Sequence, residues 1–278
     1  MTLLQAIILG IIQGLTEFLP ISSSGHLILG QSILGINDMV AMKGFDIAVH
    51  FGTLLAIFLY FRKDFAELIV SGWRGTACLL RQEAVSEVDK KAFTMIQILL
   101  VGTIPAVAVG LIFGDIIDQY LLNPLNVTMM LAIVAVVFLM AESYYKKHKN
   151  YQEIGWKEGM LIGVAQALAL IPGVSRSGAT ITSGLFLGVE RSKAARFSFI
   201  LGSVAMVAAT AYALLKVAKG EYSLPAVDIL IAGIASSFVS GWLAISFLLN
   251  YLRKHTLAVF AWYRLALVAI FWAGWLWF

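Results

Sequence analysis

The sequence is short of charge, of cysteine and of histidines spaced for metal binding, and each shortage excludes a class of protein. Asp, Glu, Lys and Arg make up only 13 % of the 278 residues, whereas an ordinary soluble domain carries about 25 %. The single cysteine, Cys78, rules out an internal disulfide, and the four histidines lack the spacing of a zinc site. A soluble domain, a disulfide scaffold and a zinc protein are therefore not expected.

Hydrophobic residues make up most of the rest of the chain. They account for 60 % of the residues, and the mean hydropathy is +0.88. Long uncharged stretches such as 92–114 and 127–141 recur along the whole length, and a helix of about 20 apolar residues crosses a bilayer. We therefore expect an all-α, multi-pass membrane protein with a single membrane domain over residues 1–278.

The amino-terminal segment lacks the basic residues of a cleavable signal peptide. The first Lys or Arg is Lys43, long after the first apolar run. We expect that run to stay in the mature chain. The net charge of +4 comes from residues between the apolar segments, where basic residues usually report topology, so a nucleic-acid partner is not expected.

Two kinds of apolar segment can be distinguished. Six stretches fit full crossings, namely 45–62, 93–113, 124–144, 196–217, 226–250 and 258–278. Two other regions, 2–36 and 158–189, are interrupted at residues 20–25 and 172–178 by Pro, Gly and Ser clusters that would end a helix.

Lys and Arg are distributed unevenly among the segments between the crossings. Fifteen lie in loops at 62–91, 146–157, 191–196 and 253–254, and only three, Lys43, Lys216 and Lys219, lie in the alternate loops. The positive-inside rule places the richer set in the cytoplasm. This arrangement requires each interrupted region to enter and leave on one side, which predicts two re-entrant helical hairpins. Their tips should meet inside the protein, since lipid cannot satisfy non-helical backbone.

A weak internal repeat relates the two hairpins. A shift of 153 residues superposes Gly10 on Gly163, Gln13 on Gln166, and Ser22, Ser24 and Gly25 on Ser175, Ser177 and Gly178; a shift of 131 pairs Gly102 with Gly233 and Gly110 with Gly241. A chance match of glycine-rich apolar sequence is the alternative. Entry from opposite sides predicts an inverted-topology repeat, with halves 1–145 and 146–278 and a binding site at their interface.

The first hairpin carries an acid, hydroxyls and an imidazole. Gln13 and Glu17 share one helix face, and a carboxylate in an apolar segment is functional by default, unless it lies in water at the tip or caps a helix. Some of the serines at 22–24 are expected to be helix N-caps. Ser23 and His26 can act as nucleophile and base if both face one cavity; otherwise His26 is hydrogen-bonded within the bundle.

The second hairpin carries a lone arginine, Arg176, between two serines at an expected helix start. A guanidinium, hydroxyls and free backbone N–H groups at a helix amino terminus make a phosphate cradle. The alternative is an ion pair between Arg176 and Glu17, which would not prevent phosphate binding. The expected phosphate-binding residues besides Arg176 are Gln13, Ser22, Ser24, Ser175, Ser177 and Thr180.

Three other polar residues lie within or beside apolar segments. Arg264 is either a second phosphate contact or an anchor near the cytoplasmic interface. Asp46 and His50 are expected to be interface or packing residues. The groups gathered on the two tips suit phosphoryl transfer, which needs charge neutralisation and an in-line attacker.

Residues 13–26 (Gln-Gly-Leu-Thr-Glu-Phe-Leu-Pro-Ile-Ser-Ser-Ser-Gly-His) and 172–180 (Pro-Gly-Val-Ser-Arg-Ser-Gly-Ala-Thr) resemble the two signature motifs of the bacterial undecaprenyl-diphosphatases, the bacitracin-resistance proteins. The resemblance extends over the whole chain. It implies hydrolysis of undecaprenyl diphosphate to undecaprenyl phosphate, the lipid carrier for cell-wall synthesis. It also implies a bacterial plasma membrane location, with the active site open to the extracytoplasmic side.

The resemblance also bears on cofactors and on single positions. It implies a divalent cation, Mg²⁺ or Ca²⁺, with Glu17 as a candidate ligand, and no organic cofactor. Gln13 stands where the family accepts Glu or Gln, which removes one carboxylate from any two-acid metal scheme, and Ser24 stands where threonine is frequent. The residues to which it assigns importance are Glu17, Ser23, His26, Ser175, Arg176 and Thr180.

The sequence is compatible with three mechanisms. In the first, Ser23 attacks with His26 as base; in the second, His26 attacks directly; in the third, water attacks with Glu17 as base or metal ligand. It is also compatible with a second class of function. A carrier for undecaprenyl phosphate is the alternative function, because broken helices in inverted repeats are a transporter architecture. A scaffold is disfavoured, since it has no use for a buried arginine beside serines. The expected partners are a polyprenyl diphosphate and membrane lipid, and a homodimer is compatible with the sequence.

Overall fold

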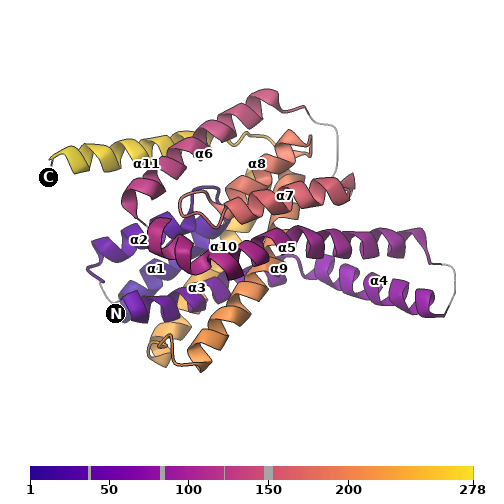
Figure 1. Cartoon of the computed structure of the whole chain (residues 1–278), viewed down its shortest axis with the longest axis horizontal. Coiled ribbons are helices and arrows are strands. Elements are labelled where there is room, and N and C mark those ends of the chain that lie inside the picture. Colours follow the sequence, from indigo (N-terminus) through magenta and orange to yellow (C-terminus); the bar gives the residue numbers. More distant parts are fainter. Residues whose placement is uncertain (37–38, 82–84, 122, 147–152, 278) are drawn as a thin grey trace.

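The computed structural model describes residues 1–36, 39–81, 85–121, 123–146 and 153–277, which form a bundle of α-helices (Figure 1). The eleven α-helices of these residues are α1 (Leu3–Phe18), α2 (Ser23–Ile33), α3 (Met39–Tyr60), α4 (Arg62–Leu80), α5 (Glu87–Leu121), α6 (Pro124–Tyr144), α7 (Trp156–Leu168), α8 (Arg176–Phe186), α9 (Arg191–Ala218), α10 (Val227–Tyr251) and α11 (Ala258–Trp277).

Five helices are long and apolar enough to cross a membrane, and they coincide with five of the six expected crossings. Their apolar parts are Met42–Tyr60, Glu87–Gly114, Pro124–Tyr144, Arg191–Ala218 and Val227–Tyr251. The sixth expected crossing, 258–278, coincides with α11, whose described apolar part, Ala258–Gly274, is shorter. Large apolar side chains such as Leu100, Ile104 and Ile112 are more than half exposed, which is typical of a helix surface that faces lipid. The prediction of an all-α chain with several potential crossings is confirmed.

The charged segment 62–91 was expected to be a loop, and that expectation is wrong. Most of it forms α4, which packs against α5 (Figure 1). Phe65 and Leu68 pack on the hydrophobic core, whereas Trp73 is 76 % exposed. The helical spacing of its apolar residues therefore outweighs the charges between them. Residues 191–196, also expected to be a loop, are the first turns of α9, while 147–152 of the expected loop 146–157 lie outside the described residues.

Both interrupted regions are broken helices, as predicted. The first break separates α1 from α2 and the second separates α7 from α8. The helices that follow the breaks, α2 and α8, have eleven residues each and coincide under the shift of 153. Each is preceded by a serine with positive φ, 76° at Ser22 and 74° at Ser175, and these are the two non-glycine residues with positive φ in the described chain.

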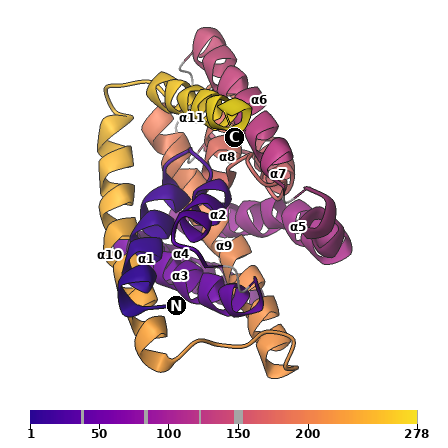
Figure 2. The same cartoon turned by 90° about the vertical axis from the view of Figure 1, so that its left-hand side faces the viewer.

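The helices that precede the breaks pack closely on two different partners. An ideal Cβ on Gly10 of α1 would lie 2.8 Å from the Gly233 carbonyl oxygen of α10, and one on Gly163 of α7 would collide with Gly102 of α5. Only a residue without a side chain permits these approaches. Figure 2 shows α1 beside α10 and α7 beside α5.

Candidate active site

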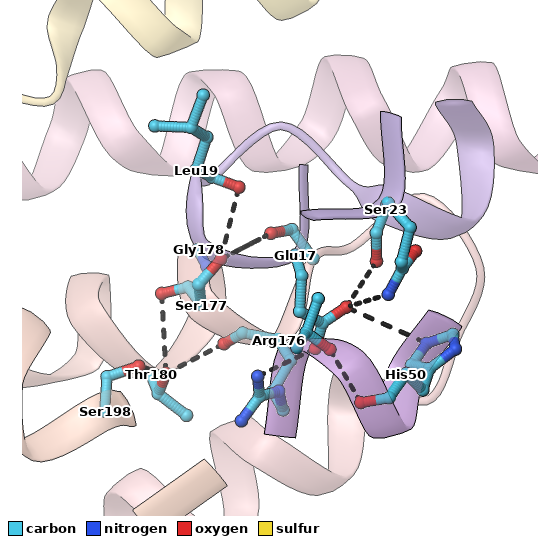
Figure 3. Close-up of polar contacts among 12 residues, drawn as sticks. Glu17, Leu19, Ser23, His50, Arg176, Ser177, Gly178, Thr180 and Ser198 are labelled. Atoms are coloured by element: carbon cyan, nitrogen blue, oxygen red, sulfur yellow. Dashed lines mark hydrogen bonds and ion pairs between the residues drawn. The ribbon is translucent and has the colours of Figure 1, made fainter. Parts of the chain in front are cut away.

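Glu17 lies at the end of α1, where the two breaks meet (Figure 3). The residue is only 8 % exposed. Its Oε1 accepts a hydrogen bond from Arg176 Nη2 at 2.8 Å, and its Oε2 accepts from Ser23 Oγ at 2.9 Å and Gln13 Nε2 at 3.0 Å. The two breaks are therefore in contact with each other, as the sequence predicts. The alternative pairing of Arg176 with Glu17 is present as well.

Arg176 is the first residue of α8, and only part of its guanidinium is used by Glu17. The Nη1 group is buried and has no hydrogen-bond partner in the structure. It lies against Gly202 of α9, where a Cβ would collide with it. A buried N–H donor without an acceptor is costly, and a phosphate oxygen is a good acceptor for a guanidinium.

The hydroxyls of the second break hold the break together. Ser175 Oγ accepts the Gly178 N–H at 3.2 Å and so caps α8, while Ser177 Oγ donates to the Leu19 carbonyl of the first break at 3.3 Å. Thr180 Oγ1 donates to the Arg176 carbonyl at 2.8 Å and lies 2.5 Å from Ser198 Oγ of α9. Each of these hydroxyls, which the sequence predicts to contact phosphate, has an internal partner in this structure.

In the first break, Ser23 pairs with the acid rather than with the imidazole. Ser22 Oγ and Ser24 Oγ lie 3.3 Å apart, and Ser22 makes no side-chain cap bond to α2. Ser23 is thus the hydroxyl of this cluster that faces Glu17 (Figure 3).

Both ring nitrogens of His26 have other partners. Nδ1 lies 2.7 Å from the Ser22 carbonyl oxygen, which can only accept, so Nδ1 carries the proton. Nε2 then accepts from the Tyr263 hydroxyl at 2.8 Å, and the two rings stack with centroids 5.7 Å apart. Tyr263 belongs to α11, 237 residues away, and nothing in the motif signals this partner.

His50 of α3 lies at the same carboxylate. Its Nε2 is 3.8 Å from Glu17 Oε2, and its Nδ1 donates to the Asp46 carbonyl at 2.7 Å. The sequence, which predicts an interface or packing residue here, does not indicate this contact of His50 with the acid. Asp46, whose carboxylate accepts from Gln31 of α2 at 3.2 Å, does pack as expected.

Arg264 is buried and joins several elements through hydrogen bonds. It is therefore neither a second phosphate contact nor an anchor near the cytoplasmic interface, and both predictions are wrong. It is 0 % exposed and lies over the Phe138 ring. Its donors reach backbone carbonyls of both breaks and of α6: Pro20 at 3.2 Å, Gly173 at 2.6 Å, Val174 at 3.3 Å, Leu131 at 3.1 Å and Met130 at 3.5 Å. Tight breaks expose carbonyls that no helix satisfies, and the guanidinium supplies their donors.

The groups around Glu17 do not fit a divalent cation held by the protein alone. In the described residues no cluster of three His, Cys, Asp or Glu side chains is placed to bind a metal. Both carboxylate oxygens already accept from donors, one of them a guanidinium. A Mg²⁺ or Ca²⁺ site needs several oxygen acceptors instead.

Comparison with known proteins identifies close relatives. Residues 6–270 match the family model described as "Bacitracin resistance protein BacA". Three curated relatives named "Undecaprenyl-diphosphatase" align over nearly their full lengths. They come from Rubrobacter xylanophilus (40 % identical over 268 residues, 96 % of either chain), Idiomarina loihiensis (42 % over 271, 97 % of this chain and 98 % of the relative) and Chlorobium luteolum (44 % over 275, 96 % and 94 %).

Proposed function

This chain belongs to the family of the bacitracin resistance protein BacA, and we propose on that premise that it acts as an undecaprenyl-diphosphatase in a membrane. It is a hydrolase that converts undecaprenyl diphosphate and water to undecaprenyl phosphate and phosphate. The observation that carries the assignment to particular atoms is the contact of Ser23 and Arg176 with one carboxylate, Glu17. Recycling of the lipid carrier for cell-wall synthesis and bacitracin resistance follow from this reaction.

Arg176 binds the diphosphate. Its unpartnered Nη1 and the amino terminus of α8 offer donors and positive potential to phosphate oxygens. The hydroxyls of Ser175, Ser177 and Thr180 lie in the first turns of the same helix, where Ser175 and Ser177 contact each other and Thr180 bonds to the Arg176 backbone carbonyl. Binding in such a cradle neutralises charge on the phosphates, which is the main requirement of phosphoryl transfer.

Ser23 is the nucleophile and Glu17 its base. As Ser23 Oγ bonds to the terminal phosphorus, Glu17 takes the hydroxyl proton, the bond from phosphorus to the bridging oxygen breaks, and undecaprenyl phosphate leaves. Once Glu17 has released that proton, it deprotonates a water molecule that attacks the phosphoserine. The bond from phosphorus to Ser23 Oγ breaks, and Ser23 Oγ takes the proton back from Glu17. The 2.9 Å hydrogen bond between Ser23 and Glu17 supports this pairing. His26 as base would first have to give up the Tyr263 hydroxyl.

The two broken helices form re-entrant hairpins in an inverted-topology repeat, with the site open to the extracytoplasmic side. The matching lengths of α2 and α8, the positive-φ serines before them, and the glycine contacts of α1 and α7 support the repeat. Most Lys and Arg residues lie in the segments that the positive-inside rule places in the cytoplasm, which supports this orientation of the site. A divalent cation and a homodimer stay predictions.

Phosphate release from undecaprenyl diphosphate by the purified full-length protein tests the assignment. We expect release by the wild type and its loss in Arg176→Ala and Glu17→Gln, with chelator lanes reporting on the cation. Quenched reactions with labelled terminal phosphate should trap label on the wild type and none on Ser23→Ala. A folded wild type that releases no phosphate with Mg²⁺ or Ca²⁺ present would refute the hydrolase. The alternative function, a carrier for undecaprenyl phosphate, would then be the better explanation. Movement of undecaprenyl phosphate across the membrane of proteoliposomes would test it.

A further inference from the structure

Glu17 has to lose a proton in every catalytic cycle, and few protein groups near its carboxylate can accept one. The carboxylate side chain is 7 % exposed, and three donors from Arg176, Ser23 and Gln13 surround it. Donors of this kind cannot accept a proton. A side chain with a free lone pair beside the carboxylate would give the proton a route to solvent.

His50 is such a group. Its Nδ1 lies 2.7 Å from the Asp46 carbonyl oxygen, so the Nδ1 proton is fixed there. In the neutral ring Nε2 then carries the lone pair, and Nε2 is the atom that faces Glu17 Oε2 at 3.8 Å. This separation exceeds a direct hydrogen bond, but one water molecule or a small side-chain rotation closes it.

A comparison of the two histidines near the site shows why His50 is the acceptor. Both donate from Nδ1 to the carbonyl four residues earlier, at Ser22 and at Asp46. The Nε2 of His26 is already bound by the Tyr263 hydroxyl. The Nε2 of His50 points to the carboxylate, and 40 % of the His50 side chain is exposed.

Few other charged groups face His50. Glu17 lies opposite it with Arg176 behind, and Asp46 lies one turn away on α3. Two long helices also pack against α3: α10 carries titratable side chains only near its ends, at Asp228 and Tyr251, and α9 carries none over residues 197–211. Among these groups, Glu17 is the acid whose carboxylate lies beside the Nε2 atom of this imidazole.

We propose that His50 takes the Ser23 proton from Glu17 and delivers it to water between the two chemical steps. This inference rests on the proposed diphosphatase function. In the first step a diphosphate with three negative charges and the serine give a lipid phosphate and a phosphoserine with two charges each, plus one proton. That proton moves from Ser23 to Glu17, then to His50 Nε2, and leaves to solvent.

The second step requires Glu17 to be ionised again. Water attacks the phosphoserine while Glu17 accepts its proton, the P–Oγ bond breaks, and Ser23 Oγ recovers that proton. Phosphate leaves with the other hydrogen of the water, so this step releases no net proton. A site without His50 therefore reaches the phosphoserine with Glu17 still protonated and unable to activate water.

The test is rapid-quench kinetics on undecaprenyl diphosphate labelled at the terminal phosphate, with the full-length protein in detergent. For His50→Gln we expect a labelled phosphoserine that forms in the first turnover and then accumulates, with kcat reduced by about 10- to 100-fold and KM within about threefold. Added imidazole should restore turnover in His50→Ala.

The control is His255→Gln, which removes a histidine that stacks on Tyr251 at the far end of α10, and it should match the wild type. The proposal is overturned if His50→Gln hydrolyses substrate like the wild type, if label formation and release fall together without imidazole rescue, or if Mg²⁺ or Ca²⁺ alone restores the variant. Failure of the wild type itself to release phosphate would instead refute the diphosphatase, and this inference with it.

Discussion

Each oxygen of Glu17 has its own set of partners, and that division explains how one carboxylate serves two purposes. Oε1 accepts from Arg176, whose charge keeps the acid ionised beside the apolar core. Oε2 accepts from Ser23 and lies by His50. The phosphate cradle and the base are therefore joined through one residue, and a substitution at either partner should have its own signature.

Arg176→Lys should distinguish the effect of the positive charge at this position from the effect of the planar guanidinium geometry. Lysine keeps the positive charge for Glu17, but an ammonium cannot bind a carboxylate and a phosphate with one planar fork. We expect a folded protein with kcat/KM reduced by about 100-fold or more, measured by phosphate release, since loss of a preorganised donor costs that order of magnitude. Arg253→Lys, in the turn after α10, is the matched control. Near-normal activity of Arg176→Lys would show that the guanidinium does not have to bind the carboxylate and the phosphate at the same time.

Tyr263→Phe should discriminate between the two candidate bases. The substitution removes the hydroxyl from His26 Nε2 and leaves the ring stacking in place. If Glu17 is the base, the activity should change by less than about tenfold, the range of one hydrogen bond. A clear rise in the rate of phosphoserine formation would instead show that freeing His26 supplies the base.

At the scale of secondary-structure elements, the two breaks differ from the helices in their backbone hydrogen bonding. A break leaves backbone carbonyls without helical donors, and here Arg264 supplies donors to both breaks and to α6. The positive-φ serines set the direction in which α2 and α8 begin. Both short helices begin beside Glu17, whose carboxylate bonds to the first residue of each, Ser23 and Arg176.

Arg264→Ala should therefore destabilise the protein more than any substitution of a phosphate-binding hydroxyl. It leaves several buried carbonyls without donors, each costing about 1–3 kcal/mol, and Arg264→Lys should recover only part of the loss. Thermal unfolding in detergent, with Thr180→Ala for comparison, measures the effect. A melting temperature of Arg264→Ala equal to that of the wild type would show that these hydrogen bonds are dispensable.

At the scale of the whole molecule, the features that could be predicted are those that a local pattern encodes. The breaks follow from Pro, Gly and Ser clusters, and the meeting of Glu17 with Arg176 follows from the need to bury irregular backbone. Tyr263 and His50 could not be assigned to the site, because their contacts depend on how α11 and α3 pack against the first hairpin. The α4 helix forms where the charges predict a loop, because its apolar residues recur at helical spacing between the charged ones.

The proposed inverted repeat makes a prediction about topology. Ile33 and Phe186 end α2 and α8, correspond under the shift of 153, and are 76 % and 50 % exposed. An inverted repeat places such equivalent positions on opposite sides of the membrane. In a Cys78→Ser background, single cysteines at these two positions should react with a membrane-impermeant maleimide from opposite faces, Ile33→Cys in intact cells and Phe186→Cys only in inverted vesicles. Labelling of both from one side would rule out the inverted arrangement while leaving the Glu17–Arg176 contact intact.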